Sequence, residues 1–548
     1  MRLLTSAVGL TLVAGALAAP APPAAPDDVL QAIDRGIRFL RQREAGRGHW
    51  EDSAQVAAAR PGGMTALAVL ALLEAGVKPD DAVVRRGLDY LRKLEPKHTY
   101  CVGLQTAVFA RVGDPQDRPR IQRNVDWLVA ARVLRGGKLH GWGYDRNTAG
   151  ADNSNSQFAV LGLDAGRRAG ARIPADVWQS VRDFYLATQE ADGEWGYSPD
   201  YGTRAGTLTM TVAGVNGLAI TGAADAAARL RPDGTAAGCD VARPEVMARG
   251  LGLAWVGDHF GVAGRQNVYY GLYGLARLGR NAGPRMLGGR DWYREGAAYL
   301  LANQRPDGSW SSGQSVDAVP VVSTSFAVLF LAEGRTPVVL AAFAHGAGDA
   351  WDTKPNAARH LADYAGRELF HGRPLTWQVW DARKFEPAKA DDLDAAAAEL
   401  GRVPIVWLHG HRAPQLAVVQ KELLRRYVAR GGLLLADACC GDAAFGQAFR
   451  ALAKELWPDD PLRPLPPDHP LWKAHAAVPP AAFPLEGIDC GGRLAVVFSP
   501  GPLSGWWDAG PGQSDRGDLA FRLAGNVLAL GTKMMMPPAR TTAAKPRE

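Results

Sequence analysis

The chain has few cysteines, no long uninterrupted apolar segment and no run of like charges. Its five cysteines are odd in number and scattered over 548 residues, at positions 101, 239, 439, 440 and 490. This distribution excludes the disulfide framework of a small secreted domain, although one or two disulfides could still form after export. Lys and Arg are spread without clusters at a net charge of +6, so we expect no nucleic-acid partner. No segment approaches about 20 uninterrupted apolar residues, so we expect no integral membrane segment after signal cleavage.

The N-terminus has the pattern of a secretory signal. Arg2 is followed by the apolar run 10–15 and then by the small residues of 16–18. We expect residues 1–18 to be removed as a signal peptide and residues 19–28 to form a Pro/Ala tether. The Pro/Ala/Thr-rich tail, 533–548, is predicted to be disordered. The predicted location is therefore periplasmic or extracellular, away from cytosolic prenyl diphosphates.

Three stretches of the chain are similar to one another at fixed spacing. In each, an aromatic residue precedes a Gln or Glu by five positions, and a Trp follows six positions later. The three pairs are Glu44 and Trp50, Gln189 and Trp195, and Gln304 and Trp310. Such self-similarity indicates a repeat architecture.

Each repeat joins an amphipathic helix to an almost wholly apolar one. Val29, Ile33 and Leu40 recur at helical spacing, whereas residues 65–75 are apolar nearly all round and are followed by Gly76. Six such inner helices are predicted, near 65–75, 102–112, 155–165, 208–220, 268–278 and 324–333. Six hairpins with a buried inner set favour a closed α/α toroid over 29–346, although an open solenoid fits the same pattern.

The Gln…Gly-x-Trp loops and Thr-rich inner helices resemble the repeats of the prenyltransferase and squalene–hopene cyclase superfamily, over about 29–335. That superfamily includes cyclases, zinc prenyltransferases and non-catalytic toroids, so the resemblance implies the fold more than an activity. The cyclases' Asp-rich motif is missing, because only Asp317 stands near the helix that carries Ser323 and Thr324. The prenyltransferases' zinc ligands are missing too, since Tyr replaces the His and no Cys matches.

The second half of the chain has a different pattern. A buried strand at 404–410, a helix at 415–429 and a second strand at 433–437 form a βαβ unit, which implies parallel pairing. We therefore expect a smaller α/β domain with a mainly parallel sheet over 347–532, with few contacts across Gly346-Ala347-Gly348. This half resembles an uncharacterised bacterial domain with a flavodoxin-like or class I glutamine-amidotransferase-like layout, over about 355–532, which occurs joined to toroid repeats.

Several residues of this second half follow predicted strands. The ends of parallel strands collect ligands, and His-x-His with carboxylates suits zinc or another divalent ion. The candidates are His409, His411, Asp437 and His469. The simpler interpretation is that they bond loop amides and form a turn. Cys439 and Cys440 lack the amidotransferase elbow and are interpreted as packing residues, and no cofactor is predicted.

Polar and aromatic residues gather where the inner helices begin. Candidates for binding a polar ligand are Trp142, Tyr144, Asn153, Asn155, Gln157, Tyr269 and Tyr270. The alternative is that the polar residues cap helices and that the tryptophans pack between repeats.

The sequence favours an exported, non-catalytic binding or assembly module whose partner is an unknown polar ligand or envelope component. Two alternatives stay open. One is an envelope polysaccharide-active hydrolase or lyase with Asp145 or Asp152 as acid or base in the toroid cavity. The other is a divergent terpenoid cyclase that uses Asp317.

Overall fold

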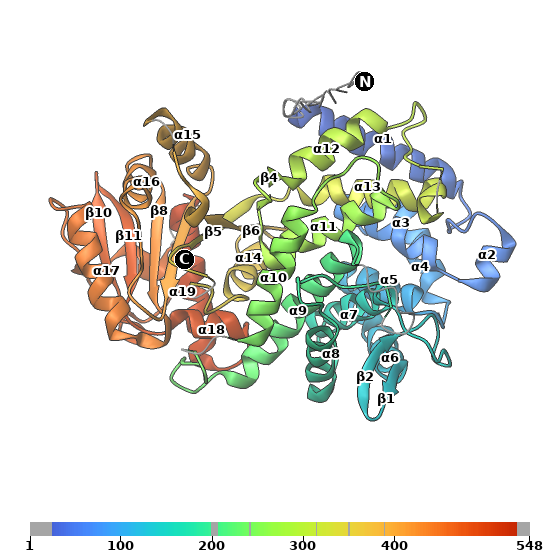
Figure 1. Ribbon diagram of the computed structural model, residues 1–548, viewed down its shortest axis with the longest axis horizontal. Coiled ribbons are helices and arrows are strands. Elements are labelled where there is room, and N and C mark those ends of the chain that lie inside the picture. The colour runs from blue at the N-terminus through green and yellow to red at the C-terminus, as the bar shows by residue number, and fades with distance from the viewer. Residues whose placement is uncertain are drawn as a thin grey trace, which may run out of the picture.

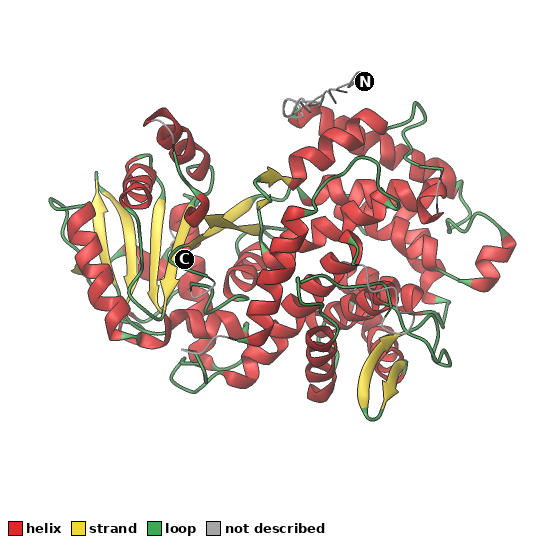
Figure 2. Ribbon diagram, viewed as in Figure 1, coloured by secondary structure: helices red, strands yellow, loops and turns green. Residues whose placement is uncertain are grey.

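The computed structural model describes residues 25–198, 206–239, 243–313, 315–348, 351–387 and 390–533. It has a helical half and a half built on a sheet with helices on both faces (Figures 1 and 2). The predicted signal peptide, and the tail beyond Lys533, lie outside the described residues. The predicted tether is too long at its end, because α1 (Pro26–Glu44) begins at Pro26 with Asp27 and Asp28 in its first turn. None of the described helices is long and apolar enough to cross a membrane.

The helical half is a closed ring, as the repeats predict. Within the described residues the inner helices are α3 (Gly63–Glu74), α5 (Thr99–Val112), α7 (Asn153–Arg168), α9 (Leu208–Arg229), α11 (Val268–Ala282) and α13 (Pro320–Glu333). Their outer partners are α1, α4 (Ala82–Arg92), α6 (Arg118–Ala130), α8 (Ala175–Ala187), α10 (Pro244–Asp258) and α12 (Trp292–Asn303). Each inner helix packs on the next, and α13 packs on α3, which closes the ring.

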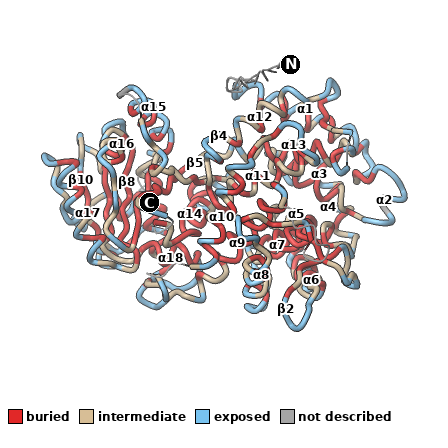
Figure 3. The backbone as a smooth tube through the Cα atoms, in the orientation of Figure 1, coloured by how far each residue is buried: buried red, intermediate tan, exposed pale blue. Residues whose placement is uncertain are grey.

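Burial explains why the helices sort into two layers. Residues 65–73 of α3 are all buried, whereas α1 buries one stripe that includes Val29, Ile33 and Leu40. An all-round apolar helix is stable only inside a protein, and an amphipathic helix needs one solvated face. Buried chain accordingly runs through the centre of both halves (Figure 3).

Four tryptophans fix the inner helices to the outer ones. Their indole Nε1 atoms donate hydrogen bonds of 2.7–2.9 Å to carbonyl oxygens of Leu40, Leu128, Tyr185 and Leu300. Their backbone N–H groups donate to hydroxyls at the starts of inner helices, those of Thr65, Ser156, Thr211 and Thr324. The tryptophans are Trp50, Trp142, Trp195 and Trp310, each at most 1% exposed.

The last repeat meets the first as successive repeats meet each other. The Gln304 side chain donates to the Ala32 carbonyl at 2.9 Å, as Gln189 donates to Ala248 at 2.8 Å. Gly36 of α1 lies against Trp310, where an added Cβ would stand 3.0 Å from the indole and 2.7 Å from a methyl group of Val328. A side chain at this position would therefore push the first and last repeats apart.

The second half is a seven-stranded sheet in the order β6-β5-β7-β8-β11-β10-β9. The strands are β5 (Val338–Ala344), β6 (Thr376–Asp381), β7 (Ile405–Gly410), β8 (Leu433–Ala438), β9 (Arg463–Pro464), β10 (Glu486–Cys490) and β11 (Arg493–Ser499). All neighbours from β6 to β11 pair in parallel, and β9 and β10 add an antiparallel edge. The mainly parallel sheet is thus confirmed.

Helices cover both faces of this sheet. One face packs against α14 (Ala357–Glu368), α18 (Leu503–Ala509) and α19 (Asp515–Gly531). The other packs against α15 (Ala390–Leu400), α16 (Val418–Ala429) and α17 (Ala443–Leu456). The α14 side faces the ring (Figure 1).

The predicted boundary at Gly346 is wrong. Strand β5 precedes it, lies inside the sheet between β6 and β7, and is buried at every residue but its first. The short apolar run was assigned to the toroid because it follows α13 directly, and periodicity does not distinguish a buried strand from a buried helix segment.

The expectation of few contacts between the halves is also wrong. Helix α18 packs against α9 of the ring. Strand β6 contacts the end of α11. The backbone N–H of Val379 donates to the Gly283 carbonyl at 2.7 Å, and the Trp377 indole donates to the Arg280 carbonyl at 3.1 Å. The two halves therefore share a continuous interface.

Candidate metal centre between the ring and the sheet

The candidates at the rim of the ring have mostly structural surroundings. Trp142 is 0% exposed and does not face a mouth of the ring; it is one of the four packing tryptophans. Asp152 caps α7, because its two carboxylate oxygens accept hydrogen bonds from the backbone and the side-chain amide of Asn155, at 2.7 and 2.8 Å. Burial raises the pKa of Asp152. Asn153 donates to the Gly196 carbonyl at 2.5 Å, but the Oδ1 atoms of Asn153 and Asn155 are buried without a hydrogen-bond partner among the described residues.

Aromatic and polar side chains fill the ring near the starts of its inner helices. The Ser154 and Tyr270 hydroxyls lie 3.2 Å apart, and Gln157 donates to the Tyr270 hydroxyl. Phe158 stacks on Tyr270 and Tyr273, with ring centroids 6.3 Å apart, and its ring is tilted against that of Tyr100 at 4.6 Å. These contacts satisfy two further candidates, Gln157 and Tyr270, within the protein.

The remaining rim candidates are scattered. Tyr144 is 40% exposed, and Tyr269 is buried with its ring 6.4 Å from that of Tyr299. Asp145 accepts a bond from Asn147 within its own turn. Asp317 accepts a hydrogen bond from the backbone of Tyr269 at 3.1 Å, at the start of α11, and burial raises its pKa.

The four candidates at the strand ends have different surroundings. Asp437 accepts bonds from the backbone of Leu503 and Ser504 at the start of α18, and burial raises its pKa to about 7. His469 caps the short helix Pro470–Lys473. His409 stacks on Trp407 at 3.7 Å in the core. Of the four candidates, His411 alone among the described residues joins a group of possible metal ligands.

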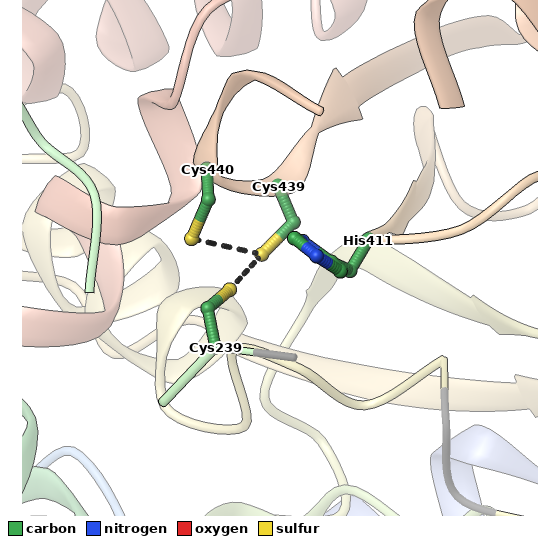
Figure 4. Close-up of side chains that lie close together, drawn as sticks. All are labelled: Cys239, His411, Cys439 and Cys440. Atoms are coloured by element: carbon green, nitrogen blue, oxygen red, sulfur yellow. Dashed lines mark hydrogen bonds between the residues drawn. The ribbon is translucent and has the colours of Figure 1, made fainter. Parts of the chain in front are cut away.

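Four donor side chains converge between the two halves. Cys239, His411, Cys439 and Cys440, here termed the Cys–His cluster, bring one potential ligand atom each within 4.8 Å of every other. Figure 4 shows the three thiols and the imidazole pointing toward one another. The Sγ atoms of Cys239 and Cys439 lie 2.7 Å apart, and those of Cys439 and Cys440 lie 3.7 Å apart.

The fold brings these donors together from three places. His411 follows β7 and Cys439 follows β8, so both lie at the carboxyl edge of neighbouring parallel strands. Cys440 adopts a left-handed conformation, with φ 57°, which turns the chain directly after β8. Cys239 comes from the ring, in the segment after α9. That segment packs on α18, since Gly505 has no room for a side chain beside Gly234.

The surroundings of the cluster suit a cation bound by thiolates. Buried Lys354 places its ammonium 3.3 Å from Cys239 Sγ and 3.7 Å from Cys440 Sγ. Hydrogen bonds from Cys239 and Cys439 lower the pKa of Cys440, and the Lys354 charge acts in the same direction. The pKa values of Cys439 and Cys239 are raised, so Cys440 is the thiol of the cluster that loses its proton first.

His411 is oriented as a metal ligand usually is. Its Nδ1 is buried without a hydrogen-bond partner among the described residues, and its Nε2 lies 3.6 Å from a carboxylate oxygen of Asp442. Metal-bound imidazoles commonly present their second nitrogen to a carboxylate, which holds the ring in place. Three thiolates and one imidazole are a soft donor set typical of tetrahedral zinc.

No spacing along the sequence points to this cluster. Cys239 lies 200 residues before Cys439, and neither belongs to a Cys-x-x-Cys pair, so the thiols were interpreted as packing residues. The one signal was that His411 and Cys439 each follow a predicted parallel strand.

Comparison with known proteins gave one family match and structural matches of low similarity. A family model described as a domain of unknown function (DUF4159) matches residues 339–529, which contain the sheet. No curated protein matches the chain in sequence. The apo structure of the type II terpene cyclase MstE from Scytonema is 15% identical, with a TM-score of 0.31, and the match covers 57% of this chain and 99% of that one. A variant of the same cyclase with geranylgeranyl dihydroxybenzoate bound is also 15% identical, with a TM-score of 0.31, and the match covers 56% of this chain and 97% of that one.

Proposed function

We propose that this protein is an exported, non-catalytic binding module whose two halves are held together by a zinc ion in the Cys–His cluster. The observation that carries the proposal is the origin of the four ligands. Cys239 belongs to the ring, whereas His411, Cys439 and Cys440 belong to the sheet. An ion bound to all four fixes the position of one half on the other.

The ligand set favours a structural role for the ion. Catalytic zinc usually has three protein ligands and keeps a fourth position for water or substrate, whereas four protein ligands close a tetrahedral site. Three thiolates around Zn²⁺ leave one excess negative charge. The ammonium of buried Lys354 balances it at 3.3 Å from Cys239.

A disulfide between Cys239 and Cys439 is the competing use of these side chains, since export exposes thiols to oxidation. A disulfide needs two sulfur atoms and leaves Cys440 and His411 without a purpose. The unpartnered Nδ1 of His411 and its carboxylate neighbour Asp442 favour the ion instead.

The arrangement of carboxylates supports a role without catalysis. Asp152 caps α7, Asp317 bonds the start of α11, and Asp145 closes its own turn. Each accepts a hydrogen bond from a backbone amide, whereas glycoside hydrolysis needs two carboxyl groups that are free to flank the bond to be cleaved.

Metal analysis of the full-length protein tests the proposal. We expect one zinc per chain after purification without chelator, and less than about a tenth of that in Cys440→Ser or His411→Ala. Cys490→Ser is the matched control, because Cys490 lies on β10 and bonds Asp460. Metal-free protein with a Cys239–Cys439 disulfide in its peptide map would refute the zinc site.

Export is supported by the pattern of Arg2, the apolar run 10–15 and the small residues that follow. N-terminal sequencing of the protein from its native host should begin near Ala19. An intact Met1 in the cytoplasmic fraction would remove this part of the proposal.

A further inference from the structure

A cavity of about 340 Å³ lies where the inner helices end and the sheet half begins. Its walls come from α3, α5, α7, α11 and α13, and α14 with residues 372–375 forms the opposite wall. The volume is within the range of small-molecule sites. Since both halves contribute, the cavity exists only when the sheet half is seated on the ring.

The lining carries an excess of positive charge. Six arginines and three acidic residues face the cavity: Arg111, Arg168, Arg277, Arg280, Arg367 and Arg373, with Glu74, Glu333 and Asp363. All three acids are engaged. Glu74 lies 3.1 Å from Arg111, and Arg280 serves both Glu333, at 3.6 Å, and Asp363, at 3.9 Å.

Three of the arginines are left without such partners. Arg277, Arg367 and Arg373 make no side-chain hydrogen bond or ion pair among the described residues, although the charge of Arg277 acts on nearby Glu333. The Nε of Arg277 is buried and unpartnered. A buried donor without an acceptor is unfavourable, so this position calls for an acceptor from outside the chain.

The three arginines lie at different depths in the cavity. Arg367 and Arg373 are exposed, so they stand where the cavity opens to solvent, and Arg277 lies further in, on α11. A guanidinium presents a planar fork of donors that matches carboxylate and phosphate oxygens. One ligand could therefore meet guanidinium groups both at the mouth of the cavity and in its interior.

We propose that this cavity binds a small multivalent oxyanion, one that carries two or more carboxylate or phosphate groups. The inference rests on the proposed binding role and names its ligand class. Leu104, Leu161 and Leu329 line the same walls and can cover a short carbon skeleton. A purely apolar ligand would strip water from the arginines without giving them a counter-charge, which disfavours it.

Isothermal titration of the full-length protein with pyrophosphate, citrate and neutral sorbitol tests this inference. We expect one site per chain for pyrophosphate or citrate, weakened by added salt, and no binding of sorbitol. Binding of pyrophosphate would indicate a phosphate ligand, and binding of citrate would indicate a carboxylate ligand. Arg277→Gln should raise the Kd about tenfold or more, because it removes a charged donor. Arg38→Gln, on the exposed face of α1, is the control and should leave the Kd unchanged.

Two outcomes would overturn the inference: no saturable binding of either anion, or binding that Arg277→Gln weakens no more than Arg38→Gln does. Should Arg277→Gln fail to fold, Arg373→Gln on the exposed loop takes its place with the same expectation. Zinc is measured on the same samples, so the two proposals can fail separately. One zinc per chain without anion binding would refute the oxyanion proposal alone. Anion binding by protein without zinc would refute the metal centre alone.

Discussion

Single buried side chains decide how the repeats of the ring meet. Trp142 makes the same two hydrogen bonds as the other packing tryptophans, from its indole to an outer helix and from its backbone to an inner one. The sequence left packing as only the alternative to ligand binding for Trp142, because the hairpin of β1 (Arg132–Arg135) and β2 (Lys138–Trp142) changes the spacing of this repeat. The separation from the acceptor carbonyl is 14 residues there and 10 in the other three repeats.

Trp142→Ala should cost about 3–5 kcal/mol of unfolding free energy, since it removes a fully buried indole and its hydrogen bond. Tyr144→Ala, two residues away on a side chain that is 40% exposed, should cost less than about 1 kcal/mol. Denaturant melts of both variants measure the difference. Equal and small losses would mean that Trp142 is not a packing residue.

Glu44 should make the stability of the ring depend on pH in the acid range. Its side chain is 1% exposed and pairs with Arg86 at 2.6 Å, between the first two repeats. Hydrogen bonds from Arg86, and from the backbone of Gly46 and Gly48, lower the pKa of Glu44 from 4.5 to about 2 despite the opposing effect of burial. A carboxylate whose pKa falls on folding stabilises the protein above its unfolded pKa and loses this effect as pH falls.

Glu44→Gln should therefore lower the unfolding free energy by about 2 kcal/mol at pH 7, a figure reduced for the solvent around Arg86. The gap between the variant and the native protein should close as pH falls from about 4.5 toward 2. Unfolding measured across this range would contradict the assignment if the gap stayed constant.

At the scale of elements, the sequence predicted more of the ring than of the sheet. All six inner helices were located because their apolar surface and the glycines after them are local signals. In the second half, β7, α16 and β8 were found for the same reason. Strand β5 was missed, since an apolar run of seven residues between a helix and a loop carries no periodicity of its own.

The position of β5 gives a direct prediction for fragments of the chain. A fragment of 349–533 lacks this strand, which leaves β6 and β7 without their shared neighbour. We expect it to lack a cooperative unfolding transition, whereas a fragment of 336–533 should show one. Circular dichroism during urea titration compares the two. Identical cooperative unfolding of both fragments would show that β5 is dispensable.

At the scale of the whole molecule, the ring and the sheet form one unit with two shared features, the Cys–His cluster and the arginine-lined cavity. Neither was predictable from sequence. Cys239 meets Cys439 only because α18 packs on α9. Arg277 and Arg373 line one cavity only because α14 lies against the ring, where Asp363 pairs with Arg280. Spacing along the chain carries no record of such contacts between distant segments.

Zinc K-edge X-ray absorption of the full-length protein, purified without chelator, measures the metal centre most directly. We predict three sulfur ligands at about 2.3 Å and one nitrogen ligand at about 2.0 Å. Cys440→Ser should lose the metal or replace one sulfur, and Cys490→Ser should give the spectrum of the native protein. Absence of zinc, or a first shell of oxygen and nitrogen alone, would contradict a zinc ion held by Cys239, His411, Cys439 and Cys440.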